Sequence, residues 1–204
     1  MEFCQNASVF TTNGDKVGHL DRVVVDPENK AITHIVVTKG FIFKEDKVIP
    51  IGLIADAAGE RINLRENAGD IDALPRFEEK QYVRLDDGGQ PPVVSQPLAG
   101  MPGAVASAPR ERYVKRIEHH IPEGTVALKE GAKVVTSDGK EVAHVESVVA
   151  QAEAEHASHL ILTGGLLSKE RKLVPITWFK ILGEGEVELT VEPQQVQELG
   201  AVES

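Results

Sequence analysis

Continuous and alternating runs of β-branched residues recur along the chain and predict strands throughout. Residues 16–25 and 31–39 form two such runs around Pro27 and Asn29. These two residues suit a tight reversal, because proline fixes φ and asparagine tolerates unusual turn dihedrals. Valine, isoleucine and threonine fit the half-buried, pleated surface of a sheet. The stretch therefore predicts a long antiparallel hairpin.

The same pattern returns 125 residues further along the chain without a gap. The match spans roughly 70 residues, about the size of a small independent domain. Identical pairs include Val9 and Val134, Thr11 and Thr136, Gly14 and Gly139, His19 and His144, His34 and His159, Lys47 and Lys172, and Pro50 and Pro175. A search for internal repeats thus indicates one domain present twice.

Each copy is predicted to be all-β with short turns. In the first copy we expect strands at residues 8–12, 16–25, 31–39, 47–55 and 61–65, then one helical turn at 71–74. Asn13-Gly14 and Asp138-Gly139 are typical of two-residue hairpin turns. A second helical turn is expected at 196–199.

Apolar residues on both faces of the hairpin strands indicate a curved sheet. Val23 and Val25 are expected on one face, with Leu20 and Val24 on the other. A flat sheet with one solvated face does not need this pattern, whereas a sheet curled on itself and also packed outside does. The sequence therefore predicts an all-β fold of two small β-barrels in tandem, each with a short C-terminal helical turn.

A stretch rich in glycine, proline, serine and alanine separates the two copies. Residues 86–112 show no hydrophobic periodicity, which favours a flexible linker. We place the first domain at 1–85 and the second at 113–204. Residues 113–121 are expected to form a strand, because Tyr113-Val114-Lys115 resembles Tyr82-Val83-Arg84 before the linker.

Charge and composition limit the kinds of partner that the chain is expected to bind. The net charge of −10, with Asp+Glu 32 against Lys+Arg 22, repels phosphate, so we expect no nucleic-acid partner. No run of about 18 apolar residues is present, so no membrane span is expected. Cys4 is the single cysteine, which excludes an internal disulfide. Without a secretory signal, the chain is predicted to be cytoplasmic.

The repeated histidines are the leading candidates for a metal-binding or ligand-binding role. If Val25 pairs with Ile32, Val23 faces His34, and His19 lies four residues further along, roughly 13 Å away at the rise of a strand. Two imidazoles cannot share one metal at that distance, because each Zn–N bond is about 2.0–2.1 Å. We expect strand histidines, with no metal and no cofactor. A metal- or small-ligand-binding regulatory domain that uses His19, His34, His144 and His159 is the alternative.

Other reactive residues give no catalytic constellation. His119 and His120 are adjacent in an extended segment and point to opposite faces, so they make a poor chelate. Cys4 is expected in a frayed terminus as an inert thiol. Asp70 and Asp72 are expected to cap the helical turn that follows. No nucleophile elbow is present, and we predict that the protein is not an enzyme.

Apolar residues follow a glycine at the same place in each copy and form the candidate interaction surface. They are Phe41, Ile42, Phe43, Leu166 and Leu167. Exposed clusters of this kind mark contacts with partners. The other interpretation is a loop that folds back and plugs the end of its own barrel.

The repeat resembles the PRC-barrel domain. The resemblance rests on Asn13-Gly14 or Asp138-Gly139, Val17-Gly18-His19-Leu20, Asp26-Pro27, Thr33-His34-Ile35-Val36-Val37, Val48-Ile49-Pro50-Ile51 and Leu173-Val174-Pro175-Ile176. The second copy departs at Ala143, where the first has Gly18, and at Gln151-Ala152, where the first has Asp26-Pro27. Most of the chain outside the linker shares the resemblance.

The resemblance implies docking on protein partners and no specific reaction. We therefore expect a non-enzymatic interaction or scaffold module built from two PRC-barrel repeats, with a protein partner of unknown identity. A barrel of about 75 residues buries a modest core, so docking of barrel on barrel would stabilise both. We expect that pairing within the chain, as a pseudo-two-fold pair, or between two chains in a homodimer.

Overall fold

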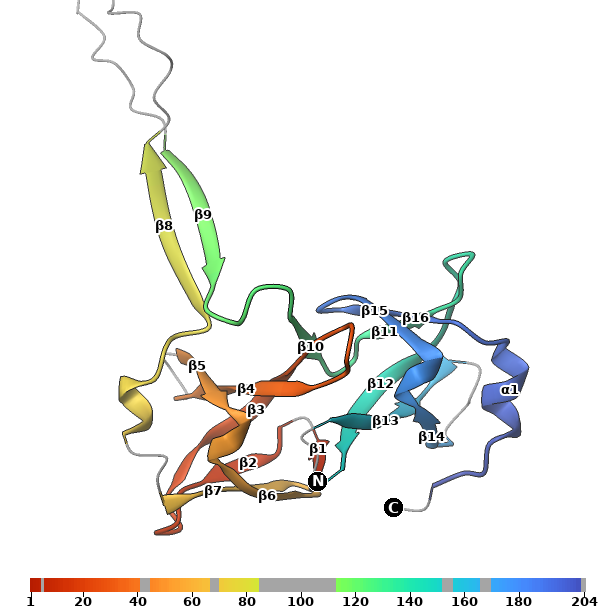
Figure 1. Cartoon of the computed structure of the whole chain (residues 1–204), viewed down its shortest axis with the longest axis horizontal. Coiled ribbons are helices and arrows are strands. Elements are labelled where there is room, and N and C mark those ends of the chain that lie inside the picture. The colour runs from red at the N-terminus through yellow and green to blue at the C-terminus, as the bar shows by residue number, and fades with distance from the viewer. Residues whose placement is uncertain are drawn as a thin grey trace, which may run out of the picture. The chain divides into compact units, whose positions relative to one another are not determined.

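The computed structural model describes residues 1–4, 6–40, 45–66, 70–84, 113–151, 156–165 and 170–202. Its strands form two seven-stranded sheets and one two-stranded ribbon (Figure 1). Met1–Phe77 and His120–Ser204 make one compact unit, and the ribbon belongs to a second unit. The linker expected at 86–112 lies outside the described residues. In the described part, no helix has the length and apolar character needed to cross a bilayer.

The first sheet follows the predicted strands of the first copy. Its order is β5-β4-β3-β2-β7-β6. These strands are β2 (Ser8–Phe10), β3 (Lys16–Val25), β4 (Ile32–Lys39), β5 (Glu45–Pro50), β6 (Ile54–Ala58) and β7 (Arg61–Leu64). The strand expected at 47–55 is interrupted by a 3₁₀ turn, η1 (Ile51–Leu53), because Pro50 cannot donate to a ladder. The helical turn expected at 71–74 is the 3₁₀ turn η3 (Ile71–Ala73).

The second sheet repeats this arrangement with the order β14-β13-β12-β11-β16-β15. Its elements are β11 (Lys133–Val135), β12 (Glu141–Ala150), β13 (Ala157–Thr163), β14 (Lys172–Pro175), η5 (Ile176–Trp178), β15 (Phe179–Gly183), β16 (Glu186–Leu189) and the helix α1 (Pro193–Glu198). A capping box at Glu192 starts α1, and Pro193 suits its first turn. Pairing registers correspond too: Val9 opposes Ile62, and Val134 opposes Val187.

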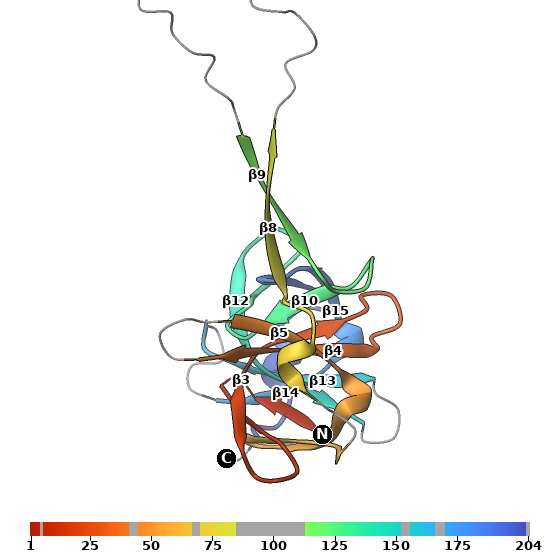
Figure 2. The same ribbon diagram turned by 90° about the vertical axis from the view of Figure 1, so that its left-hand side faces the viewer.

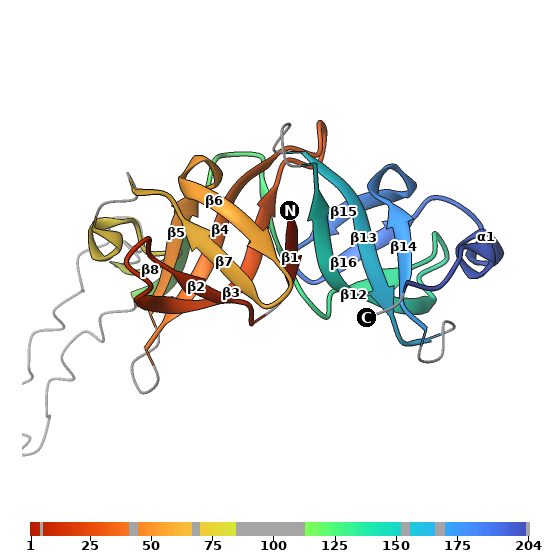
Figure 3. The same cartoon turned by 90° about the horizontal axis from the view of Figure 1, so that it is seen from below.

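Each repeat lends a strand to the sheet of the other. The strand β1 (Glu2–Cys4) pairs with β12, and β10 (Val126–Lys129) pairs with β3. Figure 3 shows β1 lying between the two sheets. An isolated bridge joins Ala31 to His156, which are equivalent residues of the two copies. Reciprocal contacts of this kind define an approximate two-fold relation between the repeats.

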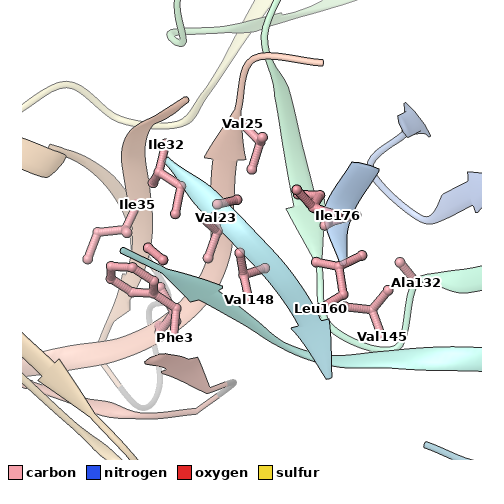
Figure 4. Packing of buried hydrophobic residues seen from close by; sticks show 14 of the residues in the cluster. Phe3, Val23, Val25, Ile32, Ile35, Ala132, Val145, Val148, Leu160 and Ile176 are labelled. Carbon is pink, nitrogen blue, oxygen red and sulfur yellow. The ribbon is translucent and has the colours of Figure 1, made fainter. Parts of the chain in front are cut away.

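One aliphatic core runs through both repeats because of this exchange. Phe3 enters it from β1 and Leu128 from β10, and each side chain is 2% exposed. Figure 4 shows Phe3 among Val23, Ile35 and Val148, so its ring packs on residues of both copies. The two sheets are therefore joined by one shared core, while the expected pairing of two PRC-barrel domains stays a prediction.

A β-bulge corrects the predicted faces of β3. The register shifts between Leu20 and Arg22, so Leu20 joins the same core as Val23 and Val25. The expectation that Leu20 shares a face with Val24 is wrong, because the extra residue reverses the alternation. Val24 does lie on the outer face of the sheet, in a second cluster with Val36, Val48, Ala127 and Phe77.

The second unit is a ribbon of β8 (Glu78–Arg84) and β9 (Tyr113–His119). These strands pair along their whole length, from Glu78 opposite His119 to Arg84 opposite Tyr113. Figure 1 shows them side by side, and in the turned view of Figure 2 the two strands cross. The strand expected at 113–121 is thus confirmed as far as His119.

Candidate functional site

The candidate interaction surface lies at corresponding hairpins of the two repeats. Phe41, Ile42, Phe43, Leu166 and Leu167 themselves fall outside the described residues. Their flanks are described. β4 ends at Lys39, which pairs with Glu45 at the start of β5, so residues 41–43 belong to the connection of this hairpin. Residues 166–167 stand between β13 and β14 in the same way.

Glycines in left-handed conformation begin both connections. Gly40 has a φ of 86°, and Gly164 and Gly165 have φ values of 73° and 58°. Residues with a Cβ rarely adopt this conformation, which explains why both connections start with glycine. The backbone therefore leaves the ends of β4 and β13 at a sharp turn just before the apolar residues.

A groove of about 810 Å³ opens on the first repeat beside this connection. Its lining comes from β3, the end of β4 and the turn before β2: Asn6, Lys16, Val17, Gly18, His19, Leu20, Asp21, Thr38 and Gly40. Gly40 is both a wall of the groove and the last described residue before Phe41. The groove is therefore continuous along the chain with the predicted apolar tip. Sequence reasoning missed it, although Gly18 was part of the family resemblance.

Gly18 allows β3 and β4 to approach closely at the groove. A Cβ built on Gly18 would lie 2.4 Å from the carbonyl oxygen of Thr38, a distance that real side chains do not tolerate. The second copy has Ala143 at this position. A Cβ built on Gly165, which corresponds to Gly40, would lie 2.2 Å from the oxygen of Val142.

Polar groups at the groove are hydrogen-bonded to their neighbours. Nδ1 of His19 lies 3.0 Å from the carbonyl oxygen of Asn6 and donates to it, since a carbonyl only accepts. Asp21 accepts from Nε of Arg22 at 2.9 Å. Thr38 Oγ1 donates to Asp46 at 2.6 Å. These contacts hold the polar rim in place around the apolar side chains of Val17 and Leu20.

The four repeated histidines occupy separate environments. His34 is opposite Val24, whereas the sequence predicted Val23; a bulge between Val24 and Val25 shifts the register, so that prediction is wrong. His144 Nε2 lies 3.3 Å from Glu141 Oε1. His159 is opposite Val149. Among the described residues, no three His, Cys, Asp or Glu side chains gather as a metal site would require.

His34 is the histidine most affected by burial. Its Nδ1 is buried and has no hydrogen-bond partner among the described residues. Burial lowers the pKa of His34 below its usual value of 6.5, because desolvation penalises the charged imidazolium. The side chain is therefore suited to remain neutral inside the sheet.

Cys4 is held in a strand and is unreactive. It stands opposite Ser147 in the exchanged ladder, so the expectation of a frayed terminus is wrong. Burial, together with the nearby carboxylate of Glu2, raises the pKa of Cys4 to about 12. A thiol of that pKa is protonated at neutral pH and is a poor nucleophile.

The remaining candidates have structural contacts. Nε2 of His119 is 3.8 Å from Glu78 Oε1 within the ribbon. His120 Nδ1 donates to the carbonyl oxygen of Arg76 at 2.9 Å. Asp70 accepts from the backbone N–H of Asp72 at 2.9 Å and caps η3, which confirms the prediction for Asp70, whereas Asp72 lies within the turn. Lys39 pairs with Asp72 and lowers the pKa of its carboxyl.

Two buried lysines are further residues that sequence reasoning left unused. Lys47 and Lys172 are each 5% exposed and occupy equivalent positions. Lys47 Nζ donates to the carbonyl oxygens of Asp72 and Leu74, and Lys172 Nζ to those of Gln197 and Leu199. They fasten the C-terminal helical turn of each repeat to its sheet. Their repetition in sequence was the available signal.

The fold is that of a small all-β barrel module, and the groove lies open on its surface. The sequence model of the PRC-barrel domain matches residues 5–71. Residues 5–71, within the first repeat, are thus similar to the PRC-barrel domain. No curated protein matches the chain.

Proposed function

We propose that the chain is a non-enzymatic protein-interaction module built from two PRC-barrel repeats. We also assign residues 113–204 to this domain type, with 1–85 as the first module and 86–112 as linker. The second sheet supports this by repeating the strand order, the registers and the buried lysine of the first. A single cysteine without a disulfide suits a cytoplasmic protein.

The groove beside Gly40 is the observation on which the proposal rests. Two other hollows are far smaller, about 10 Å³ near α1 and about 20 Å³ between β3 and β12. Each of these two hollows holds at most about one water molecule. The groove is open and partly apolar, and Phe41 follows its lining residue Gly40 in the sequence. It therefore offers a docking surface rather than a reaction chamber.

A groove of similar size on the second repeat has another character. It measures about 780 Å³ and is lined mainly by polar residues of the β11–β12 turn and of the segment before α1, among them Asp138, Glu188 and Glu192. It is not next to Leu166 in the chain. We therefore assign partner binding to the first repeat, and the second repeat provides a matched control.

A photo-crosslinking experiment in the native cell tests this assignment. A benzoylphenylalanine placed at Val17 should give one discrete adduct with a protein partner. Phe41→Ser combined with Phe43→Ser should reduce the yield at least tenfold, as expected when two central apolar anchors are lost. Leu166→Ser with Leu167→Ser is the control and should leave the yield within twofold.

A second photoprobe completes the comparison. Benzoylphenylalanine at Ser137, in the groove of the second repeat, should give no such adduct. The proposal fails if both positions capture the same protein with equal yield. It also fails if the adduct from Val17 is unaffected by the two phenylalanine substitutions.

A further inference from the structure

The outer faces of the two sheets carry equivalent apolar residues but differ in how well these are covered. On the first sheet, three valines form the outer cluster, and each is at most 3% exposed: Val24, Val36 and Val48. At the equivalent positions, 125 residues further along, the second sheet has Val149, Ile161 and Leu173. In both sheets the last two of these residues lie opposite each other. Leu173 is 36% exposed, so the second row is open where the first is closed.

A segment that follows the first sheet covers its outer face. Phe77 belongs to the outer cluster and is completely buried there. Its backbone N–H donates to the carbonyl oxygen of Asp46 at 2.7 Å, which holds the segment beside β5. Arg76, the preceding residue, forms an ion pair with Glu45 at the start of β5. An aromatic residue and an adjacent cation thus complete the first face.

The second repeat keeps the backbone contact of this segment but not its two side chains. The N–H of Val202 donates to the carbonyl oxygen of Arg171 at 2.9 Å, which is the equivalent bond. Val202 takes the place of Phe77 and is only half-buried. Ala201 takes the place of Arg76 and brings no charge. The second face therefore has the smaller cover over the larger aliphatic side chain.

Negative charge exceeds positive charge beside the open row. The side chain of Glu170 is 61% exposed and contacts Nζ of Lys172 at 2.9 Å. Oε1 of Glu146 and Oε1 of Glu2 lie 2.7 Å and 3.9 Å from Nη2 of Arg171. Among these described residues, three carboxylates thus share two cations. A segment that docks here is favoured by a positive charge of its own.

We propose that the outer face of the second repeat docks a segment of a partner protein that carries an aromatic residue next to a cation, as Arg76-Phe77 does on the first repeat. The aromatic ring covers Leu173, and the removal of both apolar surfaces from water drives the contact. The cation meets Glu170, which is equivalent to Glu45 of the first repeat. The groove beside Gly40 belongs to the first repeat, so this inference stands apart from the proposed function.

An amide NMR titration of the full chain tests the proposal. The probe is a peptide with the sequence of residues 73–77, Ala-Leu-Pro-Arg-Phe, acetylated at its start and amidated at its end. It should shift the amide resonances of Leu173 and Val202 in a saturable way. Alanine in place of the peptide's phenylalanine should weaken binding at least tenfold, because the aromatic anchor is lost. Alanine in place of its arginine should weaken binding about threefold.

Variants of the chain locate the peptide. Leu173→Ser should weaken binding at least tenfold, since it removes the apolar surface under the ring. Ile117→Ser is the matched control: Ile117 is the other large apolar residue that is exposed in the described part of the chain. This control should leave the affinity within twofold.

A repaired face provides a test that loss of folding cannot imitate. Ala201→Arg with Val202→Phe gives the second repeat the cover of the first. The double variant should lose peptide binding at least tenfold and melt no lower than the wild type. Retained peptide affinity or a lower melting temperature would overturn the proposal, as would equal effects of Leu173→Ser and Ile117→Ser. Sedimentation that shows a dimer of the wild type and a monomer of Leu173→Ser would assign the face to a second copy of the chain instead.

Discussion

Phe3 of the first repeat lies opposite Val148 of the second repeat in an antiparallel ladder. In the equivalent pair the roles are reversed: Leu128 of the second repeat lies opposite Val23 of the first repeat. Each barrel is thus completed by a strand that precedes the other barrel in the chain. A barrel of this size has a small core, and the exchange joins two small cores into one.

Phe3→Ala is expected to destabilise the second repeat although Phe3 belongs to the first. Removing a buried phenylalanine costs roughly 3–5 kcal/mol of unfolding free energy. Amide hydrogen exchange should accelerate most in β12, where Val148 opposes Phe3. Phe10→Ala, in β2 of the first sheet, is the control and should not single out β12. Equal protection of β12 in wild type and Phe3→Ala would contradict the exchange.

Lys47→Met is expected to loosen the helical turn η3 while leaving the sheet intact. The substitution removes two donors from the carbonyl oxygens of Asp72 and Leu74. A lost bond from a charged donor to a buried acceptor costs about 1–3 kcal/mol. Urea unfolding should show this loss, and amide exchange at Leu74 should accelerate. Lys172→Met should do the same at Leu199, and no local change at either turn would contradict the assigned role.

Gly18→Ala and Ala143→Gly should differ strongly although they are reciprocal changes at equivalent positions. The added methyl of Gly18→Ala meets Thr38 at 2.4 Å, so the strands must separate. Such overpacking costs about 1–3 kcal/mol. Ala143→Gly removes a methyl from a strand that already accommodates it and should cost about 0.5–1 kcal/mol. Thermal unfolding measures both, and a smaller loss for Gly18→Ala than for Ala143→Gly would contradict the close approach.

His34 should make the folded state less stable in acid. Burial lowers its pKa in the folded state below 6.5, so below that pH the unfolded chain binds the proton more readily. The stabilisation is fully present above pH 6.5 and is lost as the pH falls from 6.5 to the folded pKa. The urea concentration at the unfolding midpoint should therefore decrease as the pH is lowered from 7 to 5.

His34→Phe should flatten this pH dependence while preserving a ring that fits the same half-buried place. The comparison uses the slope of unfolding free energy against pH, so a uniform change in stability does not obscure it. If wild type and His34→Phe give the same slope, another group governs the acid sensitivity.

Local patterns predicted most of the elements but not which strands pair. The strands at 16–25 and 31–39, the turn at Asn13-Gly14 and the cap at Asp70 follow from short-range propensities, and the structure contains them. The register of His34 and the face of Leu20 were missed, because bulges insert single residues that a strict alternation does not include. The apolar tips at Phe41 and Leu166 remain predictions.

The sequence by itself determined that one β-rich unit occurs twice, because period-two patterning and turn residues are local and repeat at a constant offset. Only the tertiary structure decided that β1 and β10 exchange between the repeats. The sequence of a strand as short as Glu2–Cys4 does not indicate which other strand it pairs with. The groove beside Gly40 was decided there as well. It depends on how closely β3 approaches β4 at Gly18, a long-range contact that no local pattern records.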